Sequence, residues 1–400
     1  MTNAAGPAPT AEFPGFHLPG SPVFNVATGA GIGFGDYPDA TTVLDLAMVF
    51  GSRLWGHGED VTSAAATAAP GLGDLFTHEL RERASAALCA RVAGELAMPA
   101  DRWRALVLHT GSEAVETALK TALRATGRAK MVAFTGAYHG TFGMALAVTH
   151  SQTFRSPWHE QLPNTVTWSP WGYVPALDED VACVIVEPWQ GRAGVIPPPG
   201  GFLRALREEC NRVGAVLVID AVLCGAGRTG ATIAEGIREA RPDIVCLGKA
   251  IGGGVAASAV VARETVATAA WEHGSVEPAH TSTLVGDPVA CSGILHALTQ
   301  LETRGTELQE QSAAWQELLE DVAERTGLAL RGTGLLWALD TGRAGGGADL
   351  AARLLAEHQV LVVPSGNDGR SITLYPSVVC SPMERNRAHD ALLAAIGAVR

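Results

Sequence analysis

Two side chains that could form and stabilise an imine stand directly after apolar stretches of the chain. Lys249 follows residues 244–247 between small neighbours, and Asp220 follows residues 216–219. Partial desolvation would lower the pKa of a lysine amine at the end of a buried strand and favour imine formation. A buried carboxylate needs a cationic partner, such as a pyridinium N–H. The ordinary alternatives are a lysine that reaches solvent and an aspartate that caps a helix.

Two further turns could complete a binding site for a phosphorylated ring. Gly111 and Ser112 stand where a strand changes to a helix, and backbone N–H groups and the helix dipole favour an anion there. Tyr138 lies between Gly136 and Gly140 after the next strand, where its ring could lie flat against a ligand. The alternatives are that Ser112 simply caps the helix and that Tyr138 only packs.

These groups together are the parts that pyridoxal 5'-phosphate requires. All follow predicted strands, and α/β proteins bind ligands at the carboxyl ends of parallel strands. Only three of the 29 basic residues are lysines, Lys120, Lys130 and Lys249. The sequence therefore predicts a cofactor held as a Schiff base on Lys249, with the cofactor as electron sink.

Apolar runs that alternate with helical patterns predict the elements that position these residues. From about residue 80 the pattern predicts a parallel sheet covered on both faces, and the last seventy residues predict a smaller α+β domain. We expect an irregular arm over the first fifty residues, whose glycines do not form a dinucleotide fingerprint. The expected strands are 105–108, 131–134, 181–186, 216–219, 244–247, 257–261, 335–339, 360–363 and 371–375, and the expected helices are 80–96, 112–125, 202–213, 348–358, 382–399 and a pair over 288–325 that breaks near Arg304.

Composition bounds the class of protein. The 400 residues carry a net charge of −12 and a sequence pI near 5.5, which argues against nucleic acid as the main partner. The seven cysteines form no CxxC pair, which argues against a disulfide framework and against a metal site. It favours a reducing compartment. The first nineteen residues do not read as a signal peptide, and no apolar run reaches membrane length. We expect a cytoplasmic protein without a membrane partner.

From about Leu44 to its end, the chain resembles the class III (ornithine/GABA-type) aminotransferases of PLP fold type I. That fold is aspartate-aminotransferase-like, with a large domain around a mostly parallel sheet and a smaller α+β domain from both chain ends. The resemblance implies residues 1–50 as arm and part of the small domain, 51–295 as the large PLP-binding domain and 296–400 as the small domain. The matching motifs are residues 110–120 (TGSEAVETALK), 137–140 (AYHG), 187–191 (EPWQG), 225–230 (GAGRTG) after Asp220, 247–250 (LGKA), 280–283 (HTST) and 286–288 (GDP).

The resemblance implies a role for each matched residue. Lys249 would form the internal aldimine and shuttle the proton, and Asp220 would keep the pyridine nitrogen protonated. Gly111 and Ser112 would hold the phosphate, and Tyr138 would stack on the ring. Thr283 would reach the cofactor of the neighbouring subunit, which implies a homodimer. Further cofactor contacts are implied for His139, Glu187 and Val222, and substrate contacts for Phe50, Trp55 and Gln190.

Several positions depart from the family pattern. Leu223 stands where a glutamine often contacts the ring hydroxyl, Asp287 replaces an asparagine, and residues 375–377 read Tyr-Pro-Ser in place of Pro-Pro-Leu. Arg192 stands where many ornithine-type members have a glutamate. A positive charge there favours a substrate with an anionic group, such as a carboxylate or phosphate. The alternative is a solvated surface arginine.

The leading functional prediction is an aminotransferase that moves an amino group between an amino acid or amine and a 2-oxo acid in a ping-pong cycle. The alternative is a PLP enzyme of specialised metabolism that uses the same quinonoid carbanion for racemisation, β/γ-elimination or replacement, or carbon–carbon bond formation. A non-catalytic relative is a third class, against which Lys249 and Asp220 argue. A nicotinamide dehydrogenase would need a fingerprint that the sequence lacks.

Overall fold

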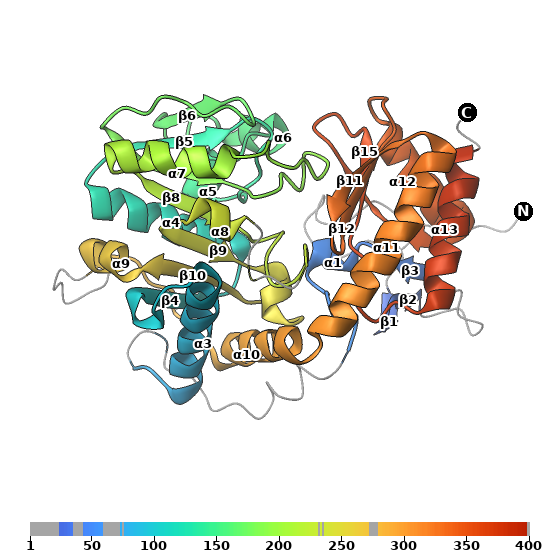
Figure 1. Ribbon diagram of the computed structural model, residues 1–400, viewed down its shortest axis with the longest axis horizontal. Coiled ribbons are helices and arrows are strands. Elements are labelled where there is room, and N and C mark those ends of the chain that lie inside the picture. Colours follow the sequence, from blue (N-terminus) through green and yellow to red (C-terminus); the bar gives the residue numbers. More distant parts are fainter. Residues whose placement is uncertain are drawn as a thin grey trace, which may run out of the picture.

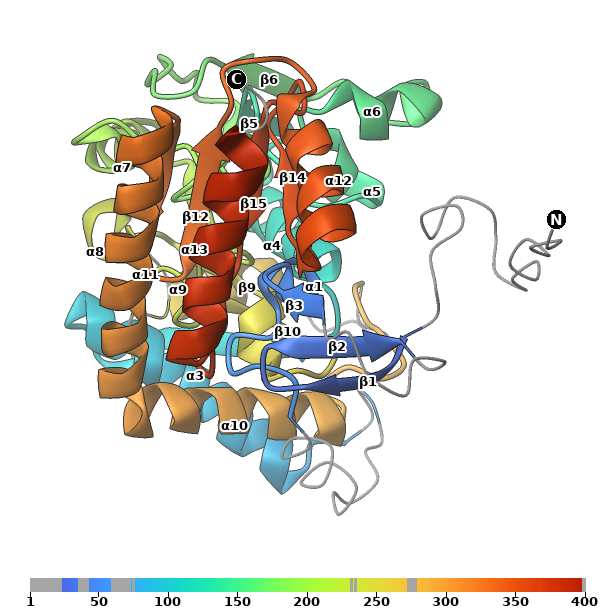
Figure 2. The same cartoon turned by 90° about the vertical axis from the view of Figure 1, so that its right-hand side faces the viewer.

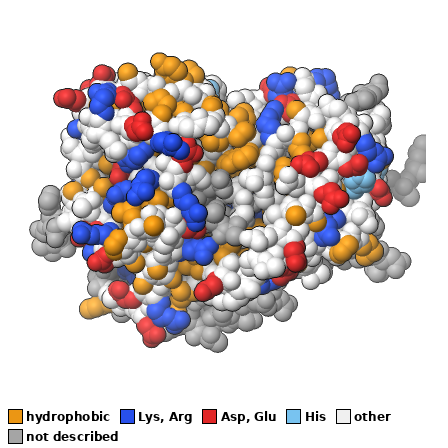
Figure 3. All heavy atoms as spheres, viewed as in Figure 1, with side chains coloured by type: hydrophobic (Ala, Val, Ile, Leu, Met, Phe, Trp, Pro, Cys, Tyr) orange, Lys and Arg blue, Asp and Glu red, His pale blue; other side chains and the backbone are white. Residues whose placement is uncertain are grey.

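The structure, a computed structural model, describes residues 24–34, 43–58, 73, 76–230, 233, 236–271 and 279–397. Figure 1 shows two parts side by side, one around a seven-stranded sheet and one built from two four-stranded sheets and their helices. Acidic and basic side chains are interspersed over the face drawn in Figure 3, so charges of one sign do not dominate that face.

The central sheet carries the predicted strands and one more. Its five strands from β9 to β6 run parallel, whereas β10 is antiparallel to both of its neighbours. The prediction of a mostly parallel sheet is confirmed, and β6 is the strand that the sequence pattern missed. In order across the sheet the strands are β4 (Trp103–Leu108), β10 (Ser258–Arg263), β9 (Ile244–Leu247), β8 (Val216–Asp220), β7 (Val181–Val186), β5 (Lys130–Phe134) and β6 (Val166–Ser169).

Both faces of this sheet are buried, which explains the near-continuous apolar runs. Along β8, Val216 and Val218 belong to one core cluster, while Leu217 and Ile219 belong to the other. Helix α4 (Gly111–Thr126) packs in the first cluster, and α3 (Glu79–Leu96) and α7 (Phe202–Val213) pack in the second. The sheet is therefore a middle layer whose strand ends remain available for a site.

The smaller part draws on both ends of the chain. One sheet joins β1 (Phe24–Thr28), β2 (Gly31–Phe34) and β3 (Val43–Asp45) to β13 (Val360–Leu361), which runs parallel to β3. The expectation of an irregular arm was wrong for these three strands: they pair with one another, and β3 is completed by β13 from the last fifty residues. The other sheet contains β11 (Ala329–Thr333), β12 (Leu336–Asp340), β15 (Ser371–Leu374) and β14 (Val363–Ser365).

The remaining longer helices follow the predicted pattern, whereas α1, α5, α6, α8 and α9 were not predicted. The expected pair over 288–325 is α10 (Pro288–Thr303) and α11 (Gly305–Thr326), separated at Arg304, and α11 lies beside α13 (Figures 1 and 2). The expected strand over 360–363 is instead the two strands β13 and β14, which belong to different sheets. The other helices are α1 (Met48–Gly51), α5 (Gly143–Ala147), α6 (Gln152–Arg155), α8 (Ile237–Ala240), α9 (Glu264–Trp271), α12 (Gly346–His358) and α13 (Pro382–Gly397).

None of the helices in the described segments combines the length and the apolar character that a bilayer span requires. All seven cysteines lie in described segments, where they are buried and unpaired.

Candidate active site

A cavity of about 500 Å³ opens at the carboxyl ends of the parallel strands and reaches the smaller part of the molecule. The large part contributes the start of α4, the loop after β5, and the residues that end or follow β7, β8 and β9. The smaller part contributes α1, β14 and the residue after β15. The lining residues are Phe50, Gly111, Ser112, Tyr138, His139, Gly140, Phe154, Glu187, Arg192, Asp220, Val222, Leu223, Lys249, Val363, Pro364, Ser365 and Tyr375.

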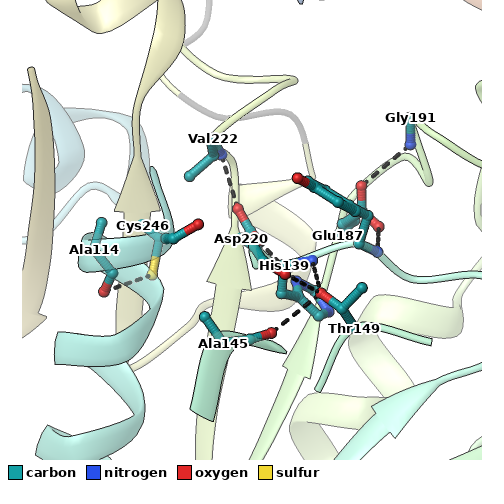
Figure 4. Close-up of polar contacts among 12 residues, drawn as sticks. Ala114, His139, Ala145, Thr149, Glu187, Gly191, Asp220, Val222 and Cys246 are labelled. Carbon is teal, nitrogen blue, oxygen red and sulfur yellow. Dashed lines mark hydrogen bonds and ion pairs between the residues drawn. The ribbon is translucent and has the colours of Figure 1, made fainter. Parts of the chain in front are cut away.

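Asp220 ends β8 and is held from two sides. Its Oδ2 lies 2.7 Å from Nδ1 of His139, and its Oδ1 accepts a hydrogen bond from the backbone N–H of Val222 at 3.0 Å (Figure 4). Both Asp220 and His139 are buried. No helix begins at this residue, so the helix-cap alternative is not what the structure shows. The carboxylate is oriented toward the cavity by these contacts.

Glu187 follows β7 and lies beside this pair. Its carboxylate accepts hydrogen bonds from the backbone N–H groups of Tyr138, at 2.9 Å, and Gly191, at 3.2 Å (Figure 4). Burial raises the pKa of Glu187 to about 7; His139 opposes this shift, whereas the negative charge of Asp220 adds to it. Glu187 therefore ties two loops of the cavity together and titrates near neutral pH.

Lys249 follows β9 and lines the cavity, so it is not a lysine extended along the outer surface. Its backbone is in the left-handed region, with φ of 50°, which is a strained conformation for a residue with a side chain. Burial lowers the pKa of its amine, against the opposing effect of the Asp220 and Glu187 carboxylates. A lowered pKa increases the fraction of neutral, nucleophilic amine.

The N-terminus of α4 faces the same cavity. Thr110, not Ser112, caps the helix: its Oγ1 accepts from the N–H of Glu113, whose carboxylate accepts from the N–H of Thr110. The N–H groups of Gly111 and Ser112 belong to the first helical turn, where helix geometry supplies no acceptor. A side chain at Gly111 would collide with Val222. The turn thus presents backbone N–H donors that an anion could bind, and the absence of a side chain at Gly111 lets the anion approach them.

Arg192 is exposed at the cavity and stacks on aromatic rings. The centre of its guanidinium lies 4.9 Å from the ring centre of Phe154 and 5.6 Å from that of Tyr138. No ion pair joins it to a carboxylate in the described segments of the chain. Its charge is therefore available to a ligand in the cavity. The alternative, a solvated surface arginine remote from the site, is not what the structure shows.

Three residues with predicted site roles do not line this cavity. The ring of Trp55 packs under Arg304, whose guanidinium centre lies 4.8 Å from the ring centre. Gln190 is buried, and its amide donates to the backbone oxygen of Thr135 at 2.9 Å. Thr283 is exposed on the single chain. The predicted substrate contacts of Trp55 and Gln190 thus find no direct geometric support.

The cavity also contains residues to which the sequence analysis gave no role. Gly140 and Phe154 follow the Tyr138-His139 motif, and residues 363–365 and Tyr375 come from the smaller part. The motif around Tyr138 could have pointed to Gly140. Phe154 and residues 363–365 carry no local signal, because only chain packing brings them to the strand ends.

The groups in the cavity match the chemistry of pyridoxal phosphate. An amine, a buried carboxylate held by a histidine, an aromatic ring and the N-terminus of a helix all face one volume. Lys249 would hold the cofactor aldehyde, Asp220 the ring nitrogen, and Gly111 and Ser112 the phosphate. The residues present therefore fit this cofactor.

Comparison with known proteins agrees with this geometry. A family model described as aminotransferase class-III matches residues 21–396. The acetylornithine aminotransferase of Methanopyrus kandleri is 41% identical over 258 residues, covering 63% of this chain and 64% of that protein. The acetylornithine aminotransferase of Archaeoglobus fulgidus is 36% identical, covering 71% of this chain and 73% of that protein. The putrescine aminotransferase of Pectobacterium atrosepticum is 36% identical, covering 67% of this chain and 60% of that protein. The aligned region thus spans just under two thirds of the first relative's length.

Solved structures share the fold over nearly the whole chain. An ornithine aminotransferase from Toxoplasma gondii superposes with a TM-score of 0.80 and 25% identity, covering 95% of this chain and 91% of that one. A Bacillus anthracis aminotransferase superposes with a TM-score of 0.83 at 20% identity, covering 96% and 95%.

Proposed function

The chain belongs to the class-III aminotransferase family of pyridoxal-phosphate-dependent transferases, and we propose that it moves an amino group from an amino acid or amine to a 2-oxo acid. The observation that carries this proposal is that Lys249, Asp220 and the N-terminus of α4 face one cavity. The relatives named above are aminotransferases, which supports transamination over the alternative outcomes of the same chemistry.

We assign the central chemical role to Lys249. When bound, pyridoxal phosphate supplies an electron sink for the pair left at the substrate carbon after a proton departs. Lys249 would hold the cofactor, and its free neutral amine would take the proton from the substrate carbon, which leaves that proton on the Lys249 Nζ. The lowered pKa of the amine suits both tasks, because the neutral form is the base.

Asp220 and its neighbours orient the site around that lysine. The Asp220 carboxylate would accept the ring N–H, and His139 holds that carboxylate through its Nδ1. Tyr138 would stack on the ring and Val222 would contact the cofactor, since both line the cavity, and Glu187 holds the Tyr138 loop.

The substrate class follows from the charges at the cavity mouth. Arg192 is a cation without an acidic partner in the described segments, and Phe50 lines the same cavity. We propose that Arg192 binds a carboxylate or phosphate of the substrate through charge-assisted hydrogen bonds. Acetylornithine carries such a group and putrescine does not, so we expect the acidic donor to be preferred.

Assembly and location are part of the same proposal. We propose a homodimer in which the exposed Thr283 reaches the cofactor of the neighbouring subunit. We also propose a cytoplasmic location, which the seven unpaired cysteines support. The division into residues 1–50, 51–295 and 296–400 is proposed as well, supported by the separate sheets of the two parts.

A single-turnover experiment tests the proposed reaction. The PLP-loaded enzyme is mixed with acetylornithine, putrescine and a panel of amino acids without any oxo acid. We expect one carbonyl product released per active site from an acidic donor, together with the amine form of the cofactor. A donor that exchanges its amino-carbon hydrogen with solvent while the cofactor returns unchanged would contradict transamination and point to racemisation or replacement.

A further inference from the structure

Arg228 is a fully buried arginine whose guanidinium contacts backbone carbonyls alone. Its Nη1 donates to the oxygens of Pro376, at 2.6 Å, and Leu335, at 3.1 Å, and its Nη2 donates to the oxygen of Gly51 at 2.8 Å. No carboxylate pairs with it in the part of the chain that the structure describes. Burying an unpaired guanidinium is costly, so these three contacts have to offset its desolvation.

The three carbonyls belong to chain segments that are remote in sequence. Gly51 directly follows Phe50, and Pro376 directly follows Tyr375, and both of those side chains line the cavity. Arg228 itself lies in the loop after β8. One guanidinium therefore bridges the large part of the molecule to two of the segments that line the cavity.

Of the two segments, the one around Gly51 has a strained backbone, which neighbouring contacts have to stabilise. Met48, Val49 and Phe50 have φ values of 42°, 51° and 54°, which is a strained backbone conformation for residues with side chains. Oδ1 of Asp45 accepts the N–H groups of Ala47 and Met48, both at 2.8 Å. Arg228 holds the other end of the turn through the oxygen of Gly51.

The two walls also contact each other directly. A Cβ at Gly51, where φ is +82°, would lie 2.9 Å from the ring of Tyr375. The N–H of Tyr375 donates to the oxygen of Leu46 at 2.7 Å, and that of Val378 donates to the oxygen of Leu54 at 2.8 Å. A displacement of one segment would therefore shift the other.

We propose that Arg228 is a positioning residue that sets the spacing of Phe50 and Tyr375 and thereby the affinity for substrate. The inference rests on the proposed function for the identity of the substrate. Lys249 and Asp220 are positioned by the central sheet, and the hydrogen bonds of the Arg228 guanidinium do not reach them. A substitution of Arg228 should therefore change the affinity for substrate without changing the affinity for the cofactor.

The test is Arg228→Lys in the holoenzyme, which keeps the charge and loses the planar fork of donors. With acetylornithine as donor, we expect KM to rise about tenfold, kcat to change less than about threefold, and the cofactor dissociation constant to stay the same. The matched control is Arg128→Lys, since Arg128 also donates to two carbonyls, those of Val181 and Val213, away from the cavity. An equal KM change in the control, or none in Arg228→Lys, overturns the proposal.

A double-mutant cycle separates positioning from plain stability. In a Tyr375→Ala background, Arg228→Lys should raise KM by less than about twofold, because one of the two side chains whose spacing Arg228 sets is already gone. Independent, additive effects would refute the mechanism. Should Arg228→Lys fail to fold, Gly51→Ala displaces Tyr375 from the opposite side and should reproduce the rise in KM, whereas an unchanged KM counts against the proposal.

Hydrogen–deuterium exchange gives a readout that does not depend on turnover. In Arg228→Lys, exchange at residues 46–54 and 375–378 should rise, while Arg128→Lys should leave it unchanged. If the wild-type protein converts neither acetylornithine nor putrescine, the proposed substrate is contradicted. The role of Arg228 is then decided by the comparison of hydrogen–deuterium exchange between the two variants. Equal exchange in the two variants overturns that role.

Discussion

Nδ1 of His139 lies 2.7 Å from Oδ2 of Asp220, and both side chains are buried at the edge of the central sheet. Because an ionised carboxylate only accepts hydrogen bonds, the imidazole donates through Nδ1. The backbone N–H of His139 in turn donates to Oγ1 of Thr149 at 2.8 Å. The carboxylate proposed to meet the cofactor nitrogen is thus oriented by a histidine that is itself fixed.

Asp220→Asn should abolish most of the activity while leaving a folded protein. The amide keeps the shape and loses the charge that would hold a protonated ring nitrogen, so we expect kcat to fall about 10²–10³-fold. Steady-state kinetics with an acidic donor checks this. Asp243→Asn is the control, because Asp243 pairs with Arg207 at the opposite end of β9. Comparable losses in both variants would argue against a special role for Asp220.

Lys249→Ala should remove the visible absorbance of a lysine-bound cofactor and lower kcat by at least about 10²–10⁴-fold, since both the covalent attachment and the base are lost. Absorbance spectra of the purified proteins measure this directly. Lys130→Ala is a clean control, because Lys130 is exposed and pairs with Asp180 at 2.6 Å. An unchanged spectrum in Lys249→Ala would show that another group holds the cofactor.

Arg192→Glu should weaken binding of donors that carry an acid group. Loss of charge-assisted hydrogen bonds of about 1.5–3 kcal/mol corresponds to a KM increase of roughly 10–100-fold for acetylornithine. The KM for putrescine should rise far less. Arg204→Glu makes the same charge change on α7, at a residue that does not line the cavity, and should have little effect. Parallel changes for both donors would place Arg192 outside substrate recognition.

Glu187 should make the protein less stable as pH rises toward neutrality. Burial raises its folded pKa to about 7 from an ordinary value near 4.5, so between these values the folded state holds a proton that the unfolded state releases. Stability from this group is therefore lost across that window, by up to roughly 3 kcal/mol. Urea unfolding at pH 5, 6 and 7 should show a flatter pH dependence for Glu187→Gln than for wild type. Identical slopes would mean that Glu187 is already ionised at pH 5.

The residues at strand ends were predictable from the sequence because each one lies within three residues of the end of its own apolar run. Lys249, Asp220 and Gly111 each follow such a run, and parallel strands bring their carboxyl ends to one edge. Periodicity alone therefore predicts that these groups share a cavity. The same local logic predicted α3, α4, α7 and α10 and the strands of the central sheet except β6, but not the shorter helices α5, α6, α8 and α9.

Only the tertiary structure decided the substrate side of the cavity. Phe154, residues 363–365 and Tyr375 reach it from segments whose local pattern gives no sign of a place in the site, and Trp55 is turned toward Arg304 instead. The pairing of β3 with β13 and the bridge from Arg228 to Gly51 and Pro376 join residues from opposite ends of the chain. Such contacts depend on how complete elements pack, and no local run of residues encodes that packing.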